Sequence, residues 1–333
     1  MTMRRPWALP LVPLYWAGLC IKNALRAAGL SRIHRLTWPV ISIGSLSAGG
    51  AGKTPVVIAL ANLLGAQGNT VDVLSRGYGR QSTEVAAVDP SVSSPTERFG
   101  DEPVLISSST GLDVWVGADR HAAGLAAELA ATQALSTTGI HLLDDGFQHR
   151  RLARNVDLVL VTAEDISDVL LPAGNRREPL SALNRAQVIL LREEECAALE
   201  PRVRRYLRPN TPIWHIRRTL NVPQIPPADL LAFSGIARPQ SFIDMLKACG
   251  LRVIDSVVFP DHHRYTADDM RRLAERLRTS TAQAFVTTEK DAVKITPELR
   301  NLLEAAGSLH VPRLGVDFAE PARVLAELEA RCR

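Results

Sequence analysis

The stretch VISIGSLSAGGAGKTP, residues 40–55, decides the fold of this chain. Its first six residues form an apolar run that predicts a buried strand, and a glycine-rich turn follows directly. The closing Thr54-Pro55 predicts the start of a helix, because the first N–H groups of a helix have no intrahelical partner and a proline is tolerated there. A strand, a glycine-rich turn ending in GKT and a helix together are the context of a phosphate-binding loop.

This loop departs from the usual pattern G-x-x-x-x-G-K-[ST], because Ser47 stands where the first glycine is expected. The departure is mild, since the backbone approaches phosphate oxygens most closely at the later glycines. We therefore expect a nucleotide site in which Lys53 reaches the β- and γ-phosphates and the Thr54 hydroxyl binds Mg²⁺. The predicted nucleotide-contacting residues are Ser47, Ala48, Gly49, Gly50, Ala51, Gly52, Lys53, Thr54 and Pro55.

A second motif supplies the acidic group that such a loop needs. IHLLDDGFQHR contains an apolar strand that ends in Asp144 and Asp145. The carboxyl ends of neighbouring parallel strands face one crevice, so these two carboxylates are expected beside the phosphate loop. One of them should hold Mg²⁺, directly or through water. A solvated turn is the alternative for an acidic pair taken alone.

The rest of the chain alternates short apolar runs with helical stretches, which predicts a parallel sheet with helices on both faces. The fold class is α/β: a P-loop NTPase-type parallel sheet, a smaller α/β C-terminal domain and an N-terminal membrane-associated helix. Helices are expected over 55–64 and 120–134. Strands are expected over 40–45, 70–75, 85–88, 113–116, 140–144, 156–161, 188–191, 230–233, 253–259 and 284–287.

The N-terminal segment holds the whole basic excess of the chain, which has 39 basic and 35 acidic residues. Six basic residues and no acidic one lie within 1–36, which leaves 33 basic and 35 acidic residues elsewhere. They surround an apolar run, 6–21, that is shorter than the ~20 residues of a spanning helix and is interrupted by Pro10 and Pro13. We expect a helix lying on an anionic bilayer. A cleaved signal peptide and an ordinary amphipathic core helix are the alternatives.

Four parts are expected along the chain. Residues 1–36 form the membrane-associated segment, 37–221 the nucleotide-binding kinase domain and 222–310 the smaller domain, with VPQIPPAD at 222–229 as the linker. Residues 311–333 form a C-terminal strand and helix, for which packing back on the first domain is one option. The four scattered cysteines have no C-x-x-C pair, so neither a disulfide framework nor a zinc site is indicated, and a reducing cytoplasmic compartment fits best.

Eight motifs in a fixed order resemble one known family, the tetraacyldisaccharide 4′-kinases, or lipid A 4′-kinases. The likeness runs from about residue 5 to about residue 320. That family also carries a serine or threonine at the position of Ser47, so the departure from the loop pattern is a family trait. The motifs are GSLSAGGAGKTP, SRGYGR, GDEP, DDGFQHRRL, LPAGNRREPL, FSGIARPQSF, FPDHHRYT and TTEKDAVK.

The resemblance implies roles for individual residues. Asp101 would be the base that takes the proton of an acceptor hydroxyl, paired with His262; the adjacent His263 leaves an ambiguity of alignment. Lys53 would stabilise the transferred phosphate. The implied metal shell is Thr54, Asp144, Asp145 and Glu178, and which of the carboxylates bind directly stays open. Weaker candidates for contacts to phosphate, sugar or nucleotide are Arg76, Tyr78, Arg120 and Asn175.

The resemblance also implies an activity and a place in the cell. The enzyme would use ATP and Mg²⁺ to phosphorylate the 4′-hydroxyl of a tetraacylated glucosamine disaccharide 1-phosphate, a lipid A precursor, on the cytoplasmic face of the inner membrane. Its partners would be this lipid and the anionic membrane surface. Neither a nucleic acid nor an obligate protein partner is expected.

Two alternatives belong to other functional classes. Deviant phosphate loops written K-G-G-x-G-K-[ST] occur in switch ATPases and GTPases of the partition and metallochaperone type, but Ala48 occupies the position of their signature lysine. A guanine-reading N-K-x-D is absent, because Lys290 directly precedes Asp291. The second alternative is a membrane-bound scaffold that only retains nucleotide, but such a protein would not need the acidic and histidine clusters.

Overall fold

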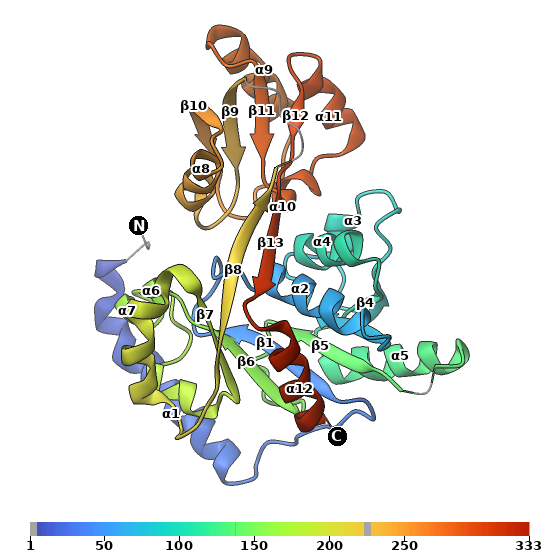
Figure 1. Ribbon diagram of the computed structural model, residues 1–333, viewed down its shortest axis with the longest axis vertical. Helices are drawn as coiled ribbons and strands as arrows, with labels where there is room; N and C mark the ends of the chain where they lie inside the picture. The colour runs from blue at the N-terminus through green and yellow to red at the C-terminus, as the bar shows by residue number, and fades with distance from the viewer. Residues whose placement is uncertain (1–4, 137, 223–227, 333) are drawn as a thin grey trace.

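The expected strand over 40–45 is β1 (Val40–Ser45), the middle strand of a nine-stranded sheet ordered β13-β8-β7-β6-β1-β5-β2-β4-β3 (Figure 1). The structure is a computed structural model that describes residues 5–136, 138–222 and 228–332 of the chain. β1 pairs in parallel with β5 and β6 on either side, and all six of its residues are buried. The phosphate-binding loop therefore leaves the centre of the molecule at the carboxyl edge of the sheet.

The seven strands predicted for this sheet are all present. Only the two edge strands, β3 and β13, are antiparallel to their neighbours. One strand, β8, was missed, because paired arginines break its apolar pattern. The remaining strands are β2 (Val71–Ser75), β3 (Ala86–Ala87), β4 (Val114–Val116), β5 (Ile140–Asp144), β6 (Val156–Leu160), β7 (Val188–Arg192), β8 (Ile213–Asn221) and β13 (Arg313–Phe318).

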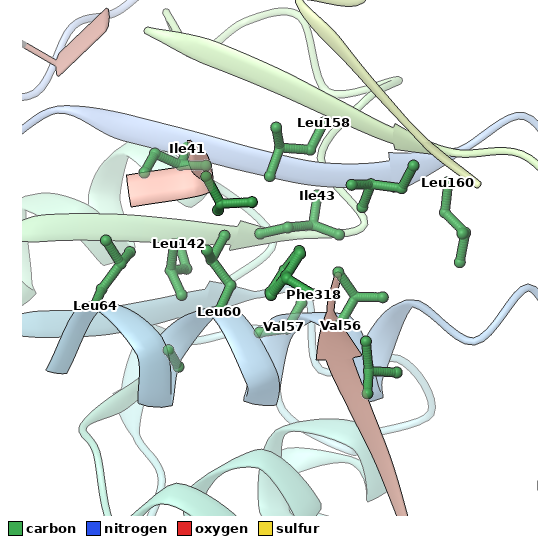
Figure 2. Packing of buried hydrophobic residues seen from close by; sticks show 14 of the residues in the cluster. Ile41, Ile43, Val56, Val57, Leu60, Leu64, Leu142, Leu158, Leu160 and Phe318 are labelled. Atoms are coloured by element: carbon green, nitrogen blue, oxygen red, sulfur yellow. The ribbon is translucent and has the colours of Figure 1, made fainter. Parts of the chain in front are cut away.

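Helices cover both faces of this sheet, which confirms the predicted fold class. On one face, α2 (Lys53–Gly65), α4 (Asp101–Thr110) and α12 (Pro321–Cys332) pack on the strands. On the other face lie α5 (Arg120–Gln133) and α7 (Glu193–Val203). Shorter helices are η1 (Pro6–Leu11), α3 (Pro95–Phe99), α6 (Ala163–Ser167), η2 (Leu180–Arg185) and η3 (Arg204–Tyr206). Figure 2 shows α2 directing Val56, Val57, Leu60 and Leu64 toward Ile41, Ile43 and Leu142 of the sheet.

A second sheet, of four parallel strands, forms what we call the cap region, residues 229–310. The strand order is β10-β9-β11-β12, with α8 (Pro239–Ala248) packed on one face and α9 (Ala267–Thr279) and α11 (Pro297–Glu304) on the other. The strands and the remaining helix are β9 (Asp229–Ser234), β10 (Arg252–Val258), β11 (Ala284–Thr287), β12 (Leu309–His310) and α10 (Glu289–Ala292). We call the rest of the protein the core region.

Two neighbouring strands connect the regions. β8 leads from the core region toward the cap region, β13 returns antiparallel to it, and Asn221 pairs with Arg313 at the point of exit (Figure 1). The expected linker at 222–229 falls largely on residues 223–227, which lie outside the described residues. After β13, α12 buries Val324 and Leu328 in the cluster that contains α2. The last strand and helix thus lie on the core region.

The N-terminal segment is one helix from Pro6 to Ala27, made of η1 and α1 (Val12–Ala27). Its prolines do not interrupt it as expected: Pro10 lies inside the 3-10 helix η1, and Pro13 lies in the first turn of α1, where a proline is tolerated. With 22 residues and a mean hydropathy of 1.2, it is the one described helix long and apolar enough to cross a membrane. No residue of α1 is buried.

Candidate active site

The phosphate-binding loop has the backbone shape that its glycines allow. Gly49, Gly50 and Gly52 adopt φ angles of 70°, 64° and 89°, values that side-chain-bearing residues rarely take. Helix α2 then begins at Lys53, with Gly52 as its N-cap. The unpaired N–H groups of the first helical turn and the positive end of the helix dipole face the loop, which makes this point of the fold an anion site.

The first two residues of the loop, Ser47 and Ala48, form hydrogen bonds within the protein. The buried Ser47 donates its hydroxyl hydrogen to the Asp165 carboxylate, and the N–H of Ala48 donates to the Asn175 carbonyl oxygen at 2.8 Å. Asp165 in turn caps α6 through Thr162. Serine at the first loop position therefore anchors the loop to α6.

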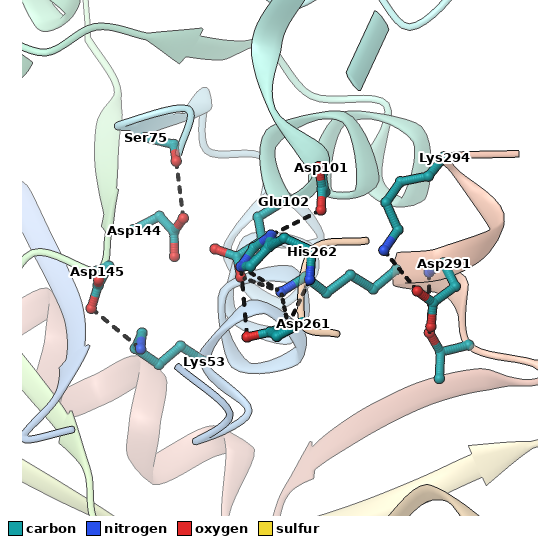
Figure 3. A network of polar contacts seen from close by, with 12 residues as sticks. Lys53, Ser75, Asp101, Glu102, Asp144, Asp145, Asp261, His262, Asp291 and Lys294 are labelled. Carbon is teal, nitrogen blue, oxygen red and sulfur yellow. Dashed lines mark hydrogen bonds and ion pairs between the residues drawn. The ribbon is translucent and has the colours of Figure 1, made fainter. Parts of the chain in front are cut away.

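Lys53 lies between the loop and the DDGFQH turn (Figure 3). Its Nζ is 3.3 Å from Asp145 Oδ1 and 3.2 Å from Ser45 Oγ. Asp145 also accepts a 2.6 Å bond from Arg177. Burial alone would raise the pKa of Asp145, but the charges of Lys53 and Arg177 outweigh it and hold the pKa below its usual value. Asp145 is therefore an ionised partner of two cations.

Asp144 has a different environment, although it precedes Asp145 directly. Asp144 is 2% exposed; its Oδ2 accepts a 3.0 Å bond from Ser75, and its Oδ1 has no hydrogen-bond partner among the described residues. Burial, together with the charges of Glu102 and Asp145, raises the pKa of Asp144 to about 7. A buried carboxylate oxygen without a partner is costly unless a cation binds it, which fits the oxygen-rich coordination that Mg²⁺ prefers.

Asp101 and His262 meet although 161 residues separate them (Figure 3). Asp101 is the first residue of α4, and His262 Nδ1 lies 3.0 Å from its Oδ2. His262 follows β10 in a tight turn with φ of 60°, which its N–H stabilises by contacts to the Gly235 carbonyl and the Asp261 carboxylate. The core region therefore supplies the carboxylate and the cap region the imidazole.

The adjacent histidine faces elsewhere. His263 Nε2 lies 3.0 Å from Asp269 of α9, and its ring stacks on Phe259 at 4.7 Å between centroids. Lys290 of α10 instead joins the Asp101 pair, with its Nζ 3.1 Å from Glu102 and 3.4 Å from His262 Nε2. Burial alone would lower the pKa of Lys290, but Glu102 and Asp261 outweigh it and raise the pKa. Lys290 thus stays a cation between the two regions.

A cavity of about 200 Å³ runs between the phosphate loop and the cap region. Residues 49–55 form one wall, and Ala237, Arg238, Phe242 and Met245 of the cap region belong to the opposite side. The two sides approach closely, because a Cβ added to Gly50 would lie 3.0 Å from the Ala237 Cβ. Apolar side chains that also line the cavity are Ile58, Leu105, Ile216, Leu220, Leu314 and Val316.

The other predicted site residues lie around this centre. Glu178 does not join Asp144 and Asp145 in one three-ligand cluster within the described residues; it is paired with Arg185 at 2.8 Å. The Tyr78 ring lies 5.2 Å from that of His262. Arg120 is buried, and its pKa is lowered mainly by burial and next by the nearby charge of Arg76. Asn175 meets the loop only through its carbonyl oxygen, as described above.

Comparison with known proteins decides the family. The family model described as Tetraacyldisaccharide-1-P 4'-kinase matches residues 5–333 of the chain. The chain belongs to this family. The match to this 4′-kinase family covers the core region, the cap region and most of the N-terminal segment, and it favours the kinase over the switch-NTPase alternative.

Individual members of the 4′-kinase family agree over nearly the full length. The Tetraacyldisaccharide 4'-kinase of Koribacter versatilis is 38% identical over 331 residues, which cover 96% of this chain and 97% of that protein. The one from Anaeromyxobacter sp. strain Fw109-5 is 40% identical over 309 residues, with 85% and 81% covered. The crystal structure of the "apo" form of LpxK from Aquifex aeolicus in complex with ATP matches with a TM-score of 0.76, 30% identity and 99% of each chain covered.

Sequence reasoning gave no role to three cations at this candidate site. Arg192, at the end of β7, donates from Nη2 to the carbonyl oxygen of loop residue Ala51 at 2.8 Å. Arg238 of the cap region lies beside Gly50 and pairs with Glu164 of the core region at 2.8 Å. Lys290 and Arg238 lie within two of the motifs on which the resemblance rests, and that position could have pointed to them. Arg192 lies in none of these motifs.

Proposed function

We infer that this protein is an ATP-dependent tetraacyldisaccharide 4′-kinase, which transfers the γ-phosphate of ATP to the 4′-hydroxyl of a tetraacylated glucosamine disaccharide 1-phosphate in lipid A biosynthesis. One observation carries this function beside the family match. The Asp101–His262 pair stands next to the phosphate loop, because Asp261 Oδ2 is 3.8 Å from the position of a Cβ on Gly49. A proton acceptor and a phosphate cradle are thus neighbours, as transfer to an alcohol requires.

The loop and the cavity suit the two halves of ATP. The N–H groups of residues 49–54 would hold the phosphates, since those of loop residues 49–52 lead directly to the first turn of α2, whose N–H groups have no intrahelical acceptor. We place the adenine in the cavity beyond the loop, against apolar side chains such as Ile58, Leu105 and Val316. A flat base buried between apolar walls requires few polar contacts, which is typical of small-molecule sites.

Lys53 would exchange partners when the nucleotide binds. Its ammonium group already lies between Asp145 and Ser45 at the mouth of the cradle. A γ-phosphate carries more negative charge than the Asp145 carboxylate, and Asp145 keeps Arg177 as its second cation. We therefore propose that Lys53 turns to the transferred phosphate, where its charge is most useful as the bond to the β-phosphate breaks.

The residues present near the loop fit a Mg²⁺ ion. Asp144 offers a buried oxygen without a partner, and Thr54 offers a hydroxyl in the first turn of α2. Bound there, Mg²⁺ supplies positive charge that neutralises the phosphate oxygens during transfer. We propose Asp144 and Thr54 as direct ligands. Asp145 and Glu178, each already paired with arginine, would act only through water or through their neighbours.

Asp101 would take the proton of the acceptor hydroxyl. His262 holds one of its oxygens at 3.0 Å, so the other oxygen can accept from the lipid. The Lys290 ammonium group contacts the other ring nitrogen of His262, Nε2, at 3.4 Å. We propose that His262 orients and tunes Asp101, while Lys290 positions His262 and holds Glu102 away from the proton path.

The acceptor would come from the membrane side of the site. The N-terminal helix docks beside it, because the Tyr15 hydroxyl donates to the Arg177 carbonyl at 2.9 Å. Arg177 in turn contacts Asp145, so the path from helix to loop is short. We propose that this helix binds the cytoplasmic face of the inner membrane, and that Arg76, Tyr78, Arg120 and Asn175 contact the phosphorylated sugar headgroup.

A single assay tests this function. Purified protein is incubated with ATP, Mg²⁺ and the tetraacylated disaccharide 1-phosphate in detergent, and the lipid is analysed by mass spectrometry. We expect one added phosphate, located at the 4′-position by fragmentation. Hydrolysis of ATP without a phosphorylated lipid would contradict the assignment.

A further inference from the structure

Three side chains with the chemistry of metal ligands meet outside the nucleotide site. Cys196 Sγ lies 3.0 Å from His215 Nε2 and 3.5 Å from Glu200 Oε2, and the last two atoms are 3.8 Å apart. Among the described residues, no other group of three or more Cys, His, Asp or Glu side chains brings its ligand atoms so close together. Neither the kinase reaction nor the packing of the sheet uses this group.

The fold holds the three ligands in place. Cys196 and Glu200 are four residues apart on α7 and therefore share one face of that helix. His215 projects from β8, which is fixed between β7 and β13; the His215 carbonyl accepts the Ala319 N–H at 2.9 Å. The backbone positions of the three ligands are thus set by a helix and a strand rather than by a loop.

A neighbouring arginine orients the carboxylate. Arg204 binds Glu200 Oε1 through Nε at 3.2 Å and through Nη2 at 2.9 Å. This leaves Oε2 directed at the cysteine and the histidine. Arg204 is itself held by the Thr211 carbonyl at 2.8 Å. Such outer contacts typically fix the direction of a ligating carboxylate and raise metal affinity.

We propose that Cys196 Sγ, His215 Nε2 and Glu200 Oε2 bind one Zn²⁺ ion. Tetrahedral coordination with zinc bonds of about 2.0–2.3 Å places ligand atoms about 3.4–3.6 Å apart. Of the three observed separations, 3.5 Å falls within that range, 3.0 Å is shorter and 3.8 Å is longer. A thiolate, an imidazole and a carboxylate suit zinc, whereas Mg²⁺ prefers oxygen ligands and would stay at the nucleotide.

Two of the three ligands border a water-accessible cavity of about 590 Å³, from which a fourth ligand could be supplied. Glu200 and His215 form one side of this cavity, and His215 and Glu200 side chains are 35% and 32% exposed. A zinc ion can therefore enter without unfolding, and a water molecule completes its shell. The bound ion ties α7 to β8, because two ligands belong to the helix and one to the strand.

Cobalt provides the direct test, because Co²⁺ occupies zinc sites and absorbs light where Zn²⁺ does not. Metal-stripped full-length protein in detergent is titrated with Co²⁺ in the presence of excess Mg²⁺ and without lipid. We expect a thiolate-to-cobalt charge-transfer band that saturates at one equivalent, and its loss on addition of one equivalent of Zn²⁺. Zn²⁺ should also raise the melting temperature.

Variants assign the ligands. Cys196→Ser should abolish the band, and His215→Gln should weaken Co²⁺ binding strongly. Arg204→Met, which removes the support of Glu200 together with the bond to the Thr211 carbonyl, should weaken Co²⁺ binding about 10- to 100-fold. Cys249→Ser removes an exposed cysteine at the end of α8 in the cap region and serves as the matched control with an unchanged band. Circular dichroism verifies that each variant is folded.

Two results would overturn the proposal. Wild-type protein without a charge-transfer band at one equivalent of Co²⁺ would leave the three side chains as a simple hydrogen-bonded group. A band that survives Cys196→Ser and disappears in Cys249→Ser would move the metal to another place. Both readouts use binding alone, so they hold whether or not the kinase assay succeeds.

Discussion

At the scale of single residues, Lys53 is the cation nearest to the expected position of the transferred phosphate. Lys53→Ala keeps the glycine-rich backbone that holds the nucleotide, so the fold and ATP binding should persist. The value of kcat should fall on the order of 10²–10³-fold, because a charge that acts in the transition state is lost. Lys247→Ala, at an exposed lysine of α8, is the control and should keep wild-type kcat. A Lys53→Ala enzyme with near-normal kcat would remove the loop from catalysis.

Asp101 and His262 should behave as one functional unit. Because His262 contacts Asp101 at 3.0 Å, each change to alanine should lower kcat on the order of 10²–10⁴-fold with little change in ATP affinity. Once Asp101 is lost, the histidine has little left to orient, so the double variant should lose much less than the product of the two effects. Steady-state kinetics on the four proteins measures this coupling.

His263→Ala is the matched control for that cycle, since His263 faces Asp269 instead. It should lower stability slightly and leave kcat near the wild-type value. Fully multiplicative losses for the Asp101 and His262 variants would give the two residues independent roles. A His263→Ala enzyme with the larger defect would show that the neighbouring histidine is the partner.

His149 makes stability depend on pH. Burial, and then the charges of Arg120 and Arg154, lower the pKa of His149 to about 4 in the folded protein. Near pH 7 the His149 ring is mostly neutral in both the folded and the unfolded protein. As the pH falls below the ordinary value of about 6.5, only the unfolded chain gains the proton, so stability is lost down to about pH 4. The loss is at most about 1.4 kcal/mol per pH unit, and smaller because the ring is partly exposed.

Urea denaturation across this pH range checks the effect. His149→Gln removes the titrating group, so the wild type should lose unfolding free energy relative to the variant as the pH falls from 6.5 toward 4. The other titrating groups are the same in both proteins, so their contributions cancel in the difference. Parallel curves for the two proteins would assign the pH dependence to other residues.

At the scale of elements, the N-terminal helix presents apolar side chains to solvent. Trp16, Ile21 and Leu25 are each about half exposed or more, while Tyr15 on the same helix contacts the site. Replacing the first three by glutamine should keep the Tyr15 contact but reduce partitioning onto anionic vesicles, because the apolar face no longer enters the bilayer. The KM for lipid should rise while ATP binding stays unchanged.

Flotation of vesicles with the purified protein measures the partitioning. Leu129→Gln alters an exposed leucine of α5 and should leave partitioning as in the wild type. Deleting residues 1–27 should have the larger effect, since it also removes the basic residues and the Tyr15 contact. Equal partitioning of the triple variant and the wild type would place the membrane contact elsewhere.

Elements with a local signal could be predicted from the sequence, and those stabilised by distant partners could not. The strand, turn and helix around Lys53 follow from apolar residues, glycines and one proline within a short stretch. β8 carries Arg217 and Arg218 in its middle, and their partners Glu193 and Glu194 lie on α7. Such a strand has no clear apolar pattern until its partners are known.

At the scale of the whole molecule, the same reason limits prediction of the site. Family resemblance paired Asp101 with His262, whereas residue patterns alone placed each only at the end of its own element. The contact depends on how the cap region sits on the core region, and Lys290, Arg238 and Arg192 enter the site by the same arrangement. Their roles became apparent only with the tertiary structure.

The pairing of Asn221 with Arg313 has a topological consequence. The chain leaves and re-enters the large sheet at directly opposed positions, so the cap region is an insertion into what would otherwise be a β-hairpin. Joining Asn221 to Arg313 through an Asn-Gly turn should therefore close β8 and β13 into a plain hairpin and leave a smaller protein that still unfolds cooperatively. The shortened protein should have no phosphotransfer activity, because it lacks His262. An unfolded product would instead show that the large sheet needs the cap region to fold.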